Sequence, residues 1–208
     1  MYTHNNNYVT AGALVAEAKA ALVMLHGRGG GAADIIRLGK VFNLSDTTIY
    51  APEATNNSWY PYSFMVPEQQ NQPALNSALE QIDALVKDIE AAGIAPEHIY
   101  FAGFSQGACL TLEYVARNAK RYGGAIAYTG GLIGENLLTE RYKGDFNGTP
   151  ILITTGDRDP HVPLKRVEES VEVLKKLGAQ VTLKVYPGKP HSIWQEEIEL
   201  AQSVVFKA

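Results

Sequence analysis

Apolar runs of strand length alternate with segments of helical periodicity along most of this chain. Continuous apolar runs are typical of strands that are covered on both faces, whereas apolar residues three and four positions apart indicate amphipathic helices. Strands are expected at 21–25, 48–51, 98–102, 124–128, 151–155 and 181–186. Helices are expected at 34–42, 73–92, 106–120, 164–177 and 193–206, with Gly93 and Gly178 ending two of them.

This alternation predicts an α/β fold, with a mostly parallel central sheet and crossover helices on both faces. The connections are polar or marked by Gly and Pro, and no linker-like stretch or internal repeat interrupts them, so a single domain over residues 1–208 is expected. Residues 1–20 are less regular. The segments 8–10 and 14–16, on either side of Gly12, predict either a small antiparallel hairpin or a partly ordered tail.

Composition and charge exclude several classes of partner. Of the 208 residues, 46% are apolar, and the formal net charge of -4 gives no attraction toward nucleic acid or an anionic membrane. The apolar stretch 11–25 is interrupted by Glu17 and Lys19, so neither a signal peptide nor stable membrane insertion is expected. Cys109 is the one cysteine and forms no intramolecular disulfide, which is consistent with a cytoplasmic protein.

Residues 103–107 read Gly-Phe-Ser-Gln-Gly and match the pattern G-x-S-x-G. By chance this pattern arises in about one chain of this size in ten, but here a predicted strand precedes it and a predicted helix follows it. That context indicates the sharp turn of an α/β-hydrolase, which lifts a serine above the carboxyl edge of the sheet. We therefore interpret Ser105 as the nucleophile of a serine hydrolase.

A serine nucleophile needs a histidine base and an acid that orients it, and in this fold they follow in the order serine, acid, histidine. Only His161 and His191 follow Ser105. His191 lies in a loop after the last predicted strand and is expected to be the base, because His161 lies too close to the acid candidates. Asp159 is the preferred acid, since Pro160 stiffens it in an extended conformation, with Asp157 as the turn-forming alternative.

The Gly-rich segment 26–31 directly follows the first predicted strand. Backbone N–H groups in such a loop stabilise an oxyanion, so the N–H of Arg28 is expected to act together with the N–H of Gln106. A phosphate-binding loop fits less well, because neither a Gly-Lys-Ser/Thr ending nor a spaced G-x-G-x-x-G is present. His26 is expected to brace the loop. Neither a metal nor an organic cofactor is needed for this chemistry.

Loops at the strand ends are expected to form the substrate pocket. The longest, 51–72, carries a group of large apolar side chains: Trp59, Tyr60, Tyr62, Phe64 and Met65. The connection 129–149 is expected to form another wall through Leu132. Trp59, Tyr60, Phe64 and Leu132 are the predicted substrate-binding residues, and they favour apolar short-to-medium acyl or aromatic substrates. Cys109, one helical turn beyond Ser105, is expected to be a buried inert thiol.

The segments LHGRGG, GFSQGA, GDRDPHVP and GKPHS, in this order, resemble the phospholipase/carboxylesterase family, which includes the acyl-protein thioesterases. The resemblance implies an α/β-hydrolase with a minimal cap or none, Ser105, Asp159 and His191 as triad, and Arg28 and Gln106 as oxyanion donors. The segment APEATNNSWYPYSF is similar to a bacterial branch of small carboxylesterases. The cationic Arg28 departs from the small or apolar residue usual in the family, so its side chain is expected either to favour acidic substrates or to pair with a nearby carboxylate.

The expected activity is hydrolysis of a small-molecule ester by a carboxylesterase that forms an acyl-enzyme on Ser105. Thioesterase, lysophospholipase and lactone hydrolase activities are alternatives, as is acyl transfer to an acceptor other than water. A non-catalytic ligand receptor on the same fold is the alternative outside the enzyme class. A homodimer is compatible with the sequence, which does not decide the oligomeric state.

Overall fold

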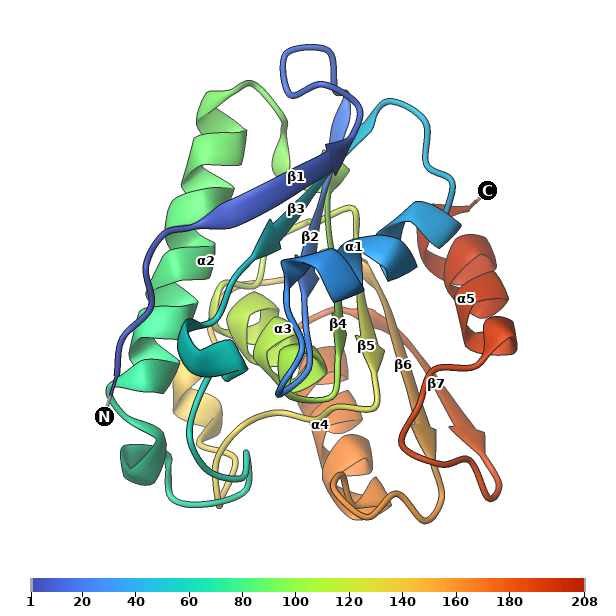
Figure 1. Ribbon diagram of the computed structural model, residues 1–208. Coiled ribbons are helices and arrows are strands. Elements are labelled where there is room, and N and C mark those ends of the chain that lie inside the picture. The colour runs from blue at the N-terminus through green and yellow to red at the C-terminus, as the bar shows by residue number, and fades with distance from the viewer. Residues whose placement is uncertain (1, 208) are drawn as a thin grey trace.

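The structure of the protein is a computed structural model that describes residues 2–207. Within these residues, seven strands form one sheet in the order β1-β3-β2-β4-β5-β6-β7 (Figure 1). The strands are β1 (Tyr8–Gly12), β2 (Ala20–Leu25), β3 (Thr47–Pro52), β4 (Ile99–Phe104), β5 (Gly124–Tyr128), β6 (Pro150–Gly156) and β7 (Gln180–Tyr186). Only the β1–β3 pair is antiparallel, so the predicted mostly parallel α/β class is confirmed.

Five α-helices connect or follow these strands in the described part of the chain. They are α1 (Ala32–Val41), α2 (Ala74–Ala91), α3 (Gln106–Arg117), α4 (Leu164–Lys176) and α5 (Gln195–Ala201). The predicted helix 193–206 is divided into α5 and a π-helical turn over Gln202–Phe206. None of the helices within residues 2–207 combines the length and apolar character needed to cross a bilayer.

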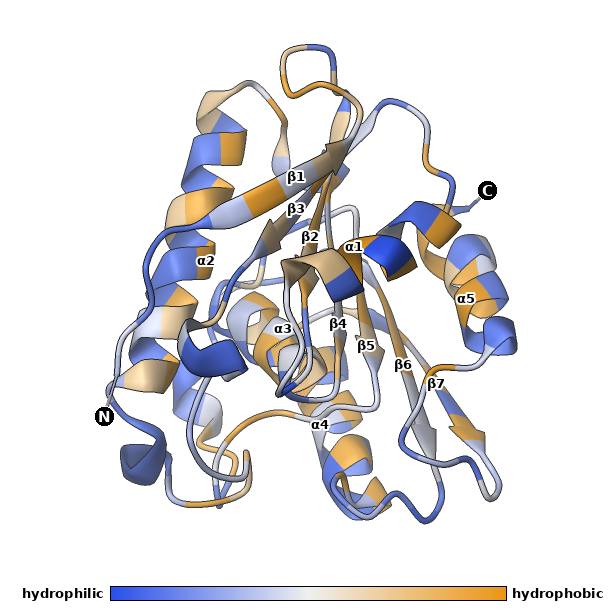
Figure 2. Ribbon diagram, viewed as in Figure 1, coloured by the Kyte–Doolittle hydropathy of each residue, from blue (hydrophilic) through white to orange (hydrophobic). Residues whose placement is uncertain are grey.

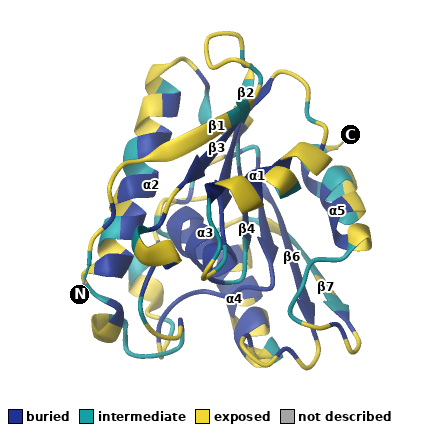
Figure 3. Cartoon of the chain, viewed as in Figure 1, coloured by how far each residue is buried: buried dark blue, intermediate teal, exposed yellow. Residues whose placement is uncertain are grey.

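The helices cover both faces of the sheet, with α1 and α5 in front and α2, α3 and α4 behind in the view of Figure 1. Side chains of β2 alternate between the two cores: Val23 and Leu25 pack with α2, α3 and α4, whereas Leu22 and Met24 pack with α1 and α5. Because successive side chains of β2 enter opposite cores, every position of the strand is apolar. The hydrophilic residues lie on the outer faces of the helices, and the central strands are buried (Figures 2 and 3).

The strand 8–10 of the predicted hairpin lies inside β1, but its predicted partner 14–16 forms no strand, and the segment is not a tail. Tyr8–Gly12 forms β1 and pairs with β3, with Tyr8 opposite Pro52. Leu14 lies instead in a turn, where its carbonyl accepts the N–H of Glu17 at 2.9 Å. Tyr8–Gly12 pairs with β3 because the outer edge of β3 would otherwise leave its N–H and C=O groups unpaired. A hairpin predicted from local spacing takes no account of a partner strand so distant in the sequence.

The parallel strands bring the loops at their carboxyl ends to one edge of the sheet. The loop after β2 carries Arg28, the turn after β4 carries Ser105, and the loops after β6 and β7 carry Asp159 and His191. Residues from four separate parts of the sequence are therefore placed around one position, which is the general location of ligand sites in open α/β sheets.

Candidate active site

Ser105 occupies the sharp turn between β4 and α3. Its backbone angles are φ 54° and ψ −118°, a conformation that costs a residue other than glycine about 1–3 kcal/mol. Tertiary contacts hold this conformation, because the Ser105 N–H donates to the Tyr128 carbonyl at 3.0 Å and the Ser105 carbonyl accepts the Cys109 N–H at 3.0 Å. The local geometry is the strand-turn-helix that the sequence predicted.

The two glycines around Ser105 leave room for backbone that approaches them closely. A Cβ atom at Gly103 would lie 2.3 Å from the Gly107 carbonyl oxygen, and one at Gly107 would lie 2.1 Å from the Leu25 carbonyl oxygen. Ser105 itself adopts the positive φ, whereas these glycines allow β4, α3 and β2 to approach one another closely. The glycines are therefore required for packing of the elbow against the sheet.

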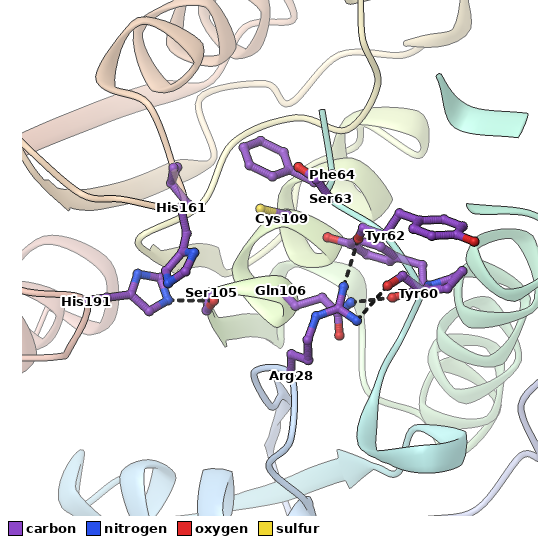
Figure 4. A pocket seen from close by; sticks show the side chains of 12 residues that line it. Arg28, Tyr60, Tyr62, Ser63, Phe64, Ser105, Gln106, Cys109, His161 and His191 are labelled. Carbon is purple, nitrogen blue, oxygen red and sulfur yellow. Dashed lines mark hydrogen bonds between the residues drawn. The ribbon is translucent and has the colours of Figure 1, made fainter. Parts of the chain in front are cut away.

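Ser105, His191 and Asp159 form a continuous chain of hydrogen bonds. The Nε2 atom of His191 lies 2.7 Å from Ser105 Oγ, and its Nδ1 atom lies 2.7 Å from Asp159 Oδ2. Figure 4 shows His191 pointing at Ser105. Donation from Nδ1–H to the carboxylate leaves Nε2 as the acceptor for the serine hydroxyl. The structure thus brings together the three residues that the sequence proposed as a triad.

The carboxylate of Asp159 is fully screened from solvent and well supplied with donors. Its Oδ1 atom accepts the backbone N–H groups of His161 and Val162, each at 2.9 Å. Burial alone raises the pKa of Asp159, but the hydrogen bond with His191 and the two backbone bonds outweigh it, so the pKa lies below its ordinary value. The site therefore holds this carboxyl group in its ionised form.

Asp157, the alternative acid, bonds to the turn after β7 and not to His191. Its Oδ1 atom accepts the Gly188 N–H at 2.7 Å, so this exposed carboxylate fixes the turn that follows β7. His161 lies beside the base, with its ring centroid 4.9 Å from that of His191 and the ring planes at 75°. The geometry distinguishes Asp159 from Asp157, and His191 from His161, as the partners of Ser105.

A buried ion pair that the sequence analysis missed supports the loop of His191. Lys189 Nζ lies 3.2 Å from Glu197 Oε1 and also donates to Thr129 Oγ1 at 3.2 Å. Glu197 accepts the hydroxyl of Thr154 through Oε1 and the Trp194 N–H through Oε2, the latter at 2.6 Å. A lysine two positions before the base is visible in the sequence, but its partner lies on the next helix.

The backbone N–H groups of Arg28 and Gln106 donate to no protein acceptor among residues 2–207. The loop that carries Arg28 lies against the nucleophile, since a Cβ atom built at Gly27 would be 3.5 Å from Ser105 Cβ. Two free N–H groups beside a nucleophile are what an oxyanion hole requires. Their catalytic role remains a prediction.

The side chains of Arg28 and Gln106 both bind the segment 58–62 (Figure 4). Arg28 donates from Nη1 to Ser58 Oγ at 2.8 Å and to the Pro61 carbonyl at 3.0 Å, and from Nη2 to the Tyr62 carbonyl at 2.8 Å. No carboxylate within residues 2–207 forms a salt bridge with Arg28. The expectation that Arg28 pairs with a carboxylate was wrong, because backbone carbonyls of this segment take its donors.

His26 braces the same region, as expected. Its Nδ1 atom bonds the Gly27 carbonyl at 2.8 Å, and its Nε2 atom accepts the Ala54 N–H at 3.2 Å. Burial lowers the pKa of His26 below its ordinary value, so the ring is neutral and suited to this pair of bonds. Both ring nitrogens of His26 thus form hydrogen bonds to backbone groups.

An open pocket of about 590 Å³ lies above Ser105. It is lined by Arg28, Tyr60, Pro61, Tyr62, Ser63, Phe64, Ser105, Gln106, Cys109, His161, Val162 and His191. Tyr60 and Phe64 line the pocket as predicted. The sequence reasoning missed Ser63, Val162 and the pocket-facing position of His161, because nothing in their spacing marks them.

The prediction that Trp59 and Leu132 bind the substrate was wrong, because both side chains are fully buried and neither lines the pocket. The indole N–H of Trp59 donates to the His26 carbonyl at 2.8 Å, and its ring packs on the imidazole of His26. Leu132 is held below the surface, where its N–H donates to Ser170 Oγ at 2.9 Å. Both residues belong to the hydrophobic core and not to the pocket surface.

Among the residues that line the pocket, one carries a permanent charge. That residue is Arg28, and the lining contains no Asp or Glu. Cys109 lies at its floor, where burial raises the pKa of the thiol to about 12, so it is not a thiolate nucleophile at neutral pH. In residues 2–207, no three His, Cys, Asp or Glu side chains converge so as to hold a metal ion.

The chain is similar to known proteins along nearly its whole length. A family profile described as Phospholipase/Carboxylesterase matches residues 6–207. A crystal structure of a phospholipase/carboxylesterase from Dyadobacter fermentans DSM 18053 is 61% identical, with a TM-score of 0.97 and 99% of each chain covered.

This chain is also similar to eukaryotic proteins. A "Probable carboxylesterase SOBER1-like" of Arabidopsis thaliana is 31% identical over 69% of this chain, and the match spans 57% of that relative's length. An acyl-protein thioesterase 1 of Debaryomyces hansenii is 30% identical over 95% of this chain and 94% of its own.

Proposed function

Because the chain belongs to the phospholipase/carboxylesterase family, we propose that it is a serine carboxylesterase that hydrolyses small esters through an acyl-enzyme on Ser105. The observation that carries the proposal is the pair of 2.7 Å contacts that join Ser105 to His191 and His191 to Asp159. The pocket directly above Ser105 supports it, since a substrate carbonyl has room there to reach the hydroxyl.

In the acylation step, Ser105 Oγ attacks the carbonyl carbon while His191 Nε2 takes the hydroxyl proton. The negative charge that develops on the carbonyl oxygen is stabilised by the N–H groups of Arg28 and Gln106. The Asp159 carboxylate stabilises the imidazolium that forms. When the carbon–oxygen bond of the ester breaks, His191 returns the proton to the leaving alkoxide, and the alcohol departs.

In the deacylation step, a water molecule takes the place of the alcohol. His191 removes a proton from this water as its oxygen attacks the acyl carbon, and the same two N–H groups stabilise the second tetrahedral intermediate. Collapse of the intermediate breaks the bond to Ser105 Oγ, which recovers its proton from His191. The products are a carboxylic acid and the free enzyme, and no cofactor enters the cycle.

The pocket walls favour a short-to-medium acyl group or an aromatic one. Tyr60, Phe64 and Val162 supply apolar surface, and the exposed Tyr62 and the hydroxyl-bearing Ser63 also line the pocket. A volume of about 590 Å³ is within the range of sites for small-molecule ligands. We therefore propose a small-molecule ester as substrate.

The test is a comparison of rates on three substrates that share one acyl group: a butyryl oxygen ester, a butyryl thioester and a lactone of similar size. A carboxylesterase is expected to give saturable hydrolysis of the oxygen ester with the highest kcat/KM. A thioester rate ten or more times higher would assign the chain to the thioesterases instead. Absence of all three activities, together with no labelling of Ser105 by a fluorophosphonate, would indicate a ligand receptor.

A further inference from the structure

We infer that residues 58–62 act as an oxyanion brace, which fixes the distance between the two N–H donors, and that Ser58 is a positioning residue for hydrolysis. The inference rests on the proposed function. The two donors belong to Arg28, in the loop after β2, and Gln106, the first residue of α3. Their separation therefore depends on how two different loops are held relative to each other.

The brace holds Arg28 by its side chain. The guanidinium makes three hydrogen bonds of 2.8–3.0 Å, to the Ser58 hydroxyl and to the carbonyls of Pro61 and Tyr62. A planar guanidinium that is bound at both of its terminal nitrogens has little freedom to rotate. These bonds therefore restrict the position of the Arg28 peptide, whose N–H is the proposed donor.

The brace holds Gln106 in a similar way. The Gln106 carboxamide accepts the Trp59 N–H at 2.9 Å and donates to the Tyr60 carbonyl at 2.8 Å, and the residue is only 5% exposed. Ser58 connects the two halves, since its Oγ atom lies 2.8 Å from Arg28 Nη1 and 3.4 Å from Gln106 Nε2. One buried hydroxyl thus contacts the side chains of both donor residues.

The loop of Arg28 has particular need of such support. Arg28 is followed by Gly29, Gly30 and Gly31, and glycine leaves a backbone freer than other residues do. Oxyanion donors stabilise the transition state because they are fixed before the reaction begins, and an error of about 1 Å in a reacting group lowers the rate by about 100-fold. The Gly29 N–H donates to the Asn57 carbonyl at 2.7 Å, and the bonds from the side chain of Arg28 add three further restraints on this glycine-rich backbone.

The experiment compares Ser58→Ala and Arg28→Met with the parent enzyme on a butyryl ester. Both variants are expected to lower kcat by about 10- to 100-fold while KM changes less than about twofold. The affinity for a trifluoromethyl ketone, which forms a tetrahedral adduct with Ser105, is expected to fall by the same factor as kcat. The affinity for the matched ketone without fluorine is expected to stay the same, since this ketone remains trigonal.

Thr55→Val is the matched control. The Thr55 hydroxyl donates to the Thr3 carbonyl at 2.8 Å, so this variant removes a hydrogen bond of the same loop after β3 that involves neither Arg28 nor Gln106. Valine is β-branched like threonine and keeps its shape. Its kcat is expected to remain within about twofold of the parent. The end point of fluorophosphonate labelling counts the folded sites in every sample, so partial unfolding is not mistaken for a slower step.

The brace is overturned if Ser58→Ala and Arg28→Met keep both kcat per labelled site and the trifluoromethyl ketone affinity within twofold of the parent. A lower melting temperature with unchanged kcat would show that residues 58–62 support stability alone. Failure of the proposed function is distinguishable, because the parent itself would then neither hydrolyse the ester nor bind the trifluoromethyl ketone. The double variant provides a further check, since two parts of one brace are expected to lose less together than the sum of their single losses.

Discussion

Lys189 and Glu197 form an ion pair with 3.2 Å between Nζ and Oε1, and both side chains are wholly screened from solvent. Lys189 lies two residues before His191, so the pair ties the loop of the base to the first turn of α5. Lys189→Met leaves a buried carboxylate without its counterion and is expected to lower the free energy of unfolding by about 3–5 kcal/mol. Urea denaturation measures this loss.

The surface pair of Lys87 and Asp83 provides a matched control for that variant, because the Lys87 side chain is 71% exposed. Lys87→Met is expected to leave the urea midpoint unchanged. Equal midpoints for Lys189→Met and Lys87→Met would show that the buried pair does not hold the loop.

The ionised Asp159 carboxylate stabilises the folded protein, and this contribution to the free energy of unfolding decreases as the pH falls. Its folded pKa lies below the ordinary value of 3.8, so its contribution is fully present above that value and is lost as the pH falls through it and then through the folded pKa. The difference in unfolding free energy between the parent and Asp159→Asn is expected to be constant between about pH 5 and 7 and to shrink below about pH 4. A difference that grew on acidification would contradict the assignment of its hydrogen bonds.

Phe64 is expected to limit the length of the acyl chain, because it lines the pocket while being only 6% exposed. Phe64→Leu opens space at the wall and is expected to raise kcat/KM for an octanoyl ester relative to a butyryl ester by about fivefold or more, since accommodating even one more methylene in an apolar pocket contributes ~1–3 kcal/mol. Phe42→Leu makes the same change in the opposite core, far from the pocket, and is expected to leave this ratio unchanged. Equal ratios in both variants would place Phe64 outside the acyl site.

Arg28 gives the pocket its one permanent charge, and this predicts a preference for anionic substrates. A p-nitrophenyl ester of a dicarboxylic acid is expected to have a KM about two- to fivefold lower than an uncharged ester of the same length, since exposed charges attract by ~0.2–1 kcal/mol. Added salt is expected to remove the difference. A KM ratio that does not change with salt would exclude this role.

The fold followed from the sequence where its signals are local. The apolar run 21–25 lies inside β2, and the G-x-S-x-G pattern marks the turn at Ser105 because that pattern lies within five residues. The pairing of β1 was missed because its partner β3 lies some forty residues further along the chain. Pairing across such a distance leaves no periodic signal in either segment.

The catalytic residues of the site were predictable from the sequence, whereas the residues that line its pocket were less so. The order of Ser105, Asp159 and His191 is readable because each follows a predicted strand. Aromatic composition, in contrast, did not reveal that the Trp59 side chain faces His26 while Phe64 faces the pocket. The oxyanion brace and the Lys189–Glu197 pair also escaped the sequence analysis, since each depends on contacts between separate loops and helices.

The identity of the nucleophile is the central claim, and Ser105→Ala tests it most directly. Substitution removes the Oγ atom that lies 2.7 Å from His191 Nε2 and leaves the oxyanion donors in place. Hydrolysis of p-nitrophenyl butyrate by the purified, folded variant is expected to fall by at least about 1,000-fold, toward the residual level that the oxyanion hole and binding alone supply. A rate for Ser105→Ala equal to that of the parent would contradict the assignment.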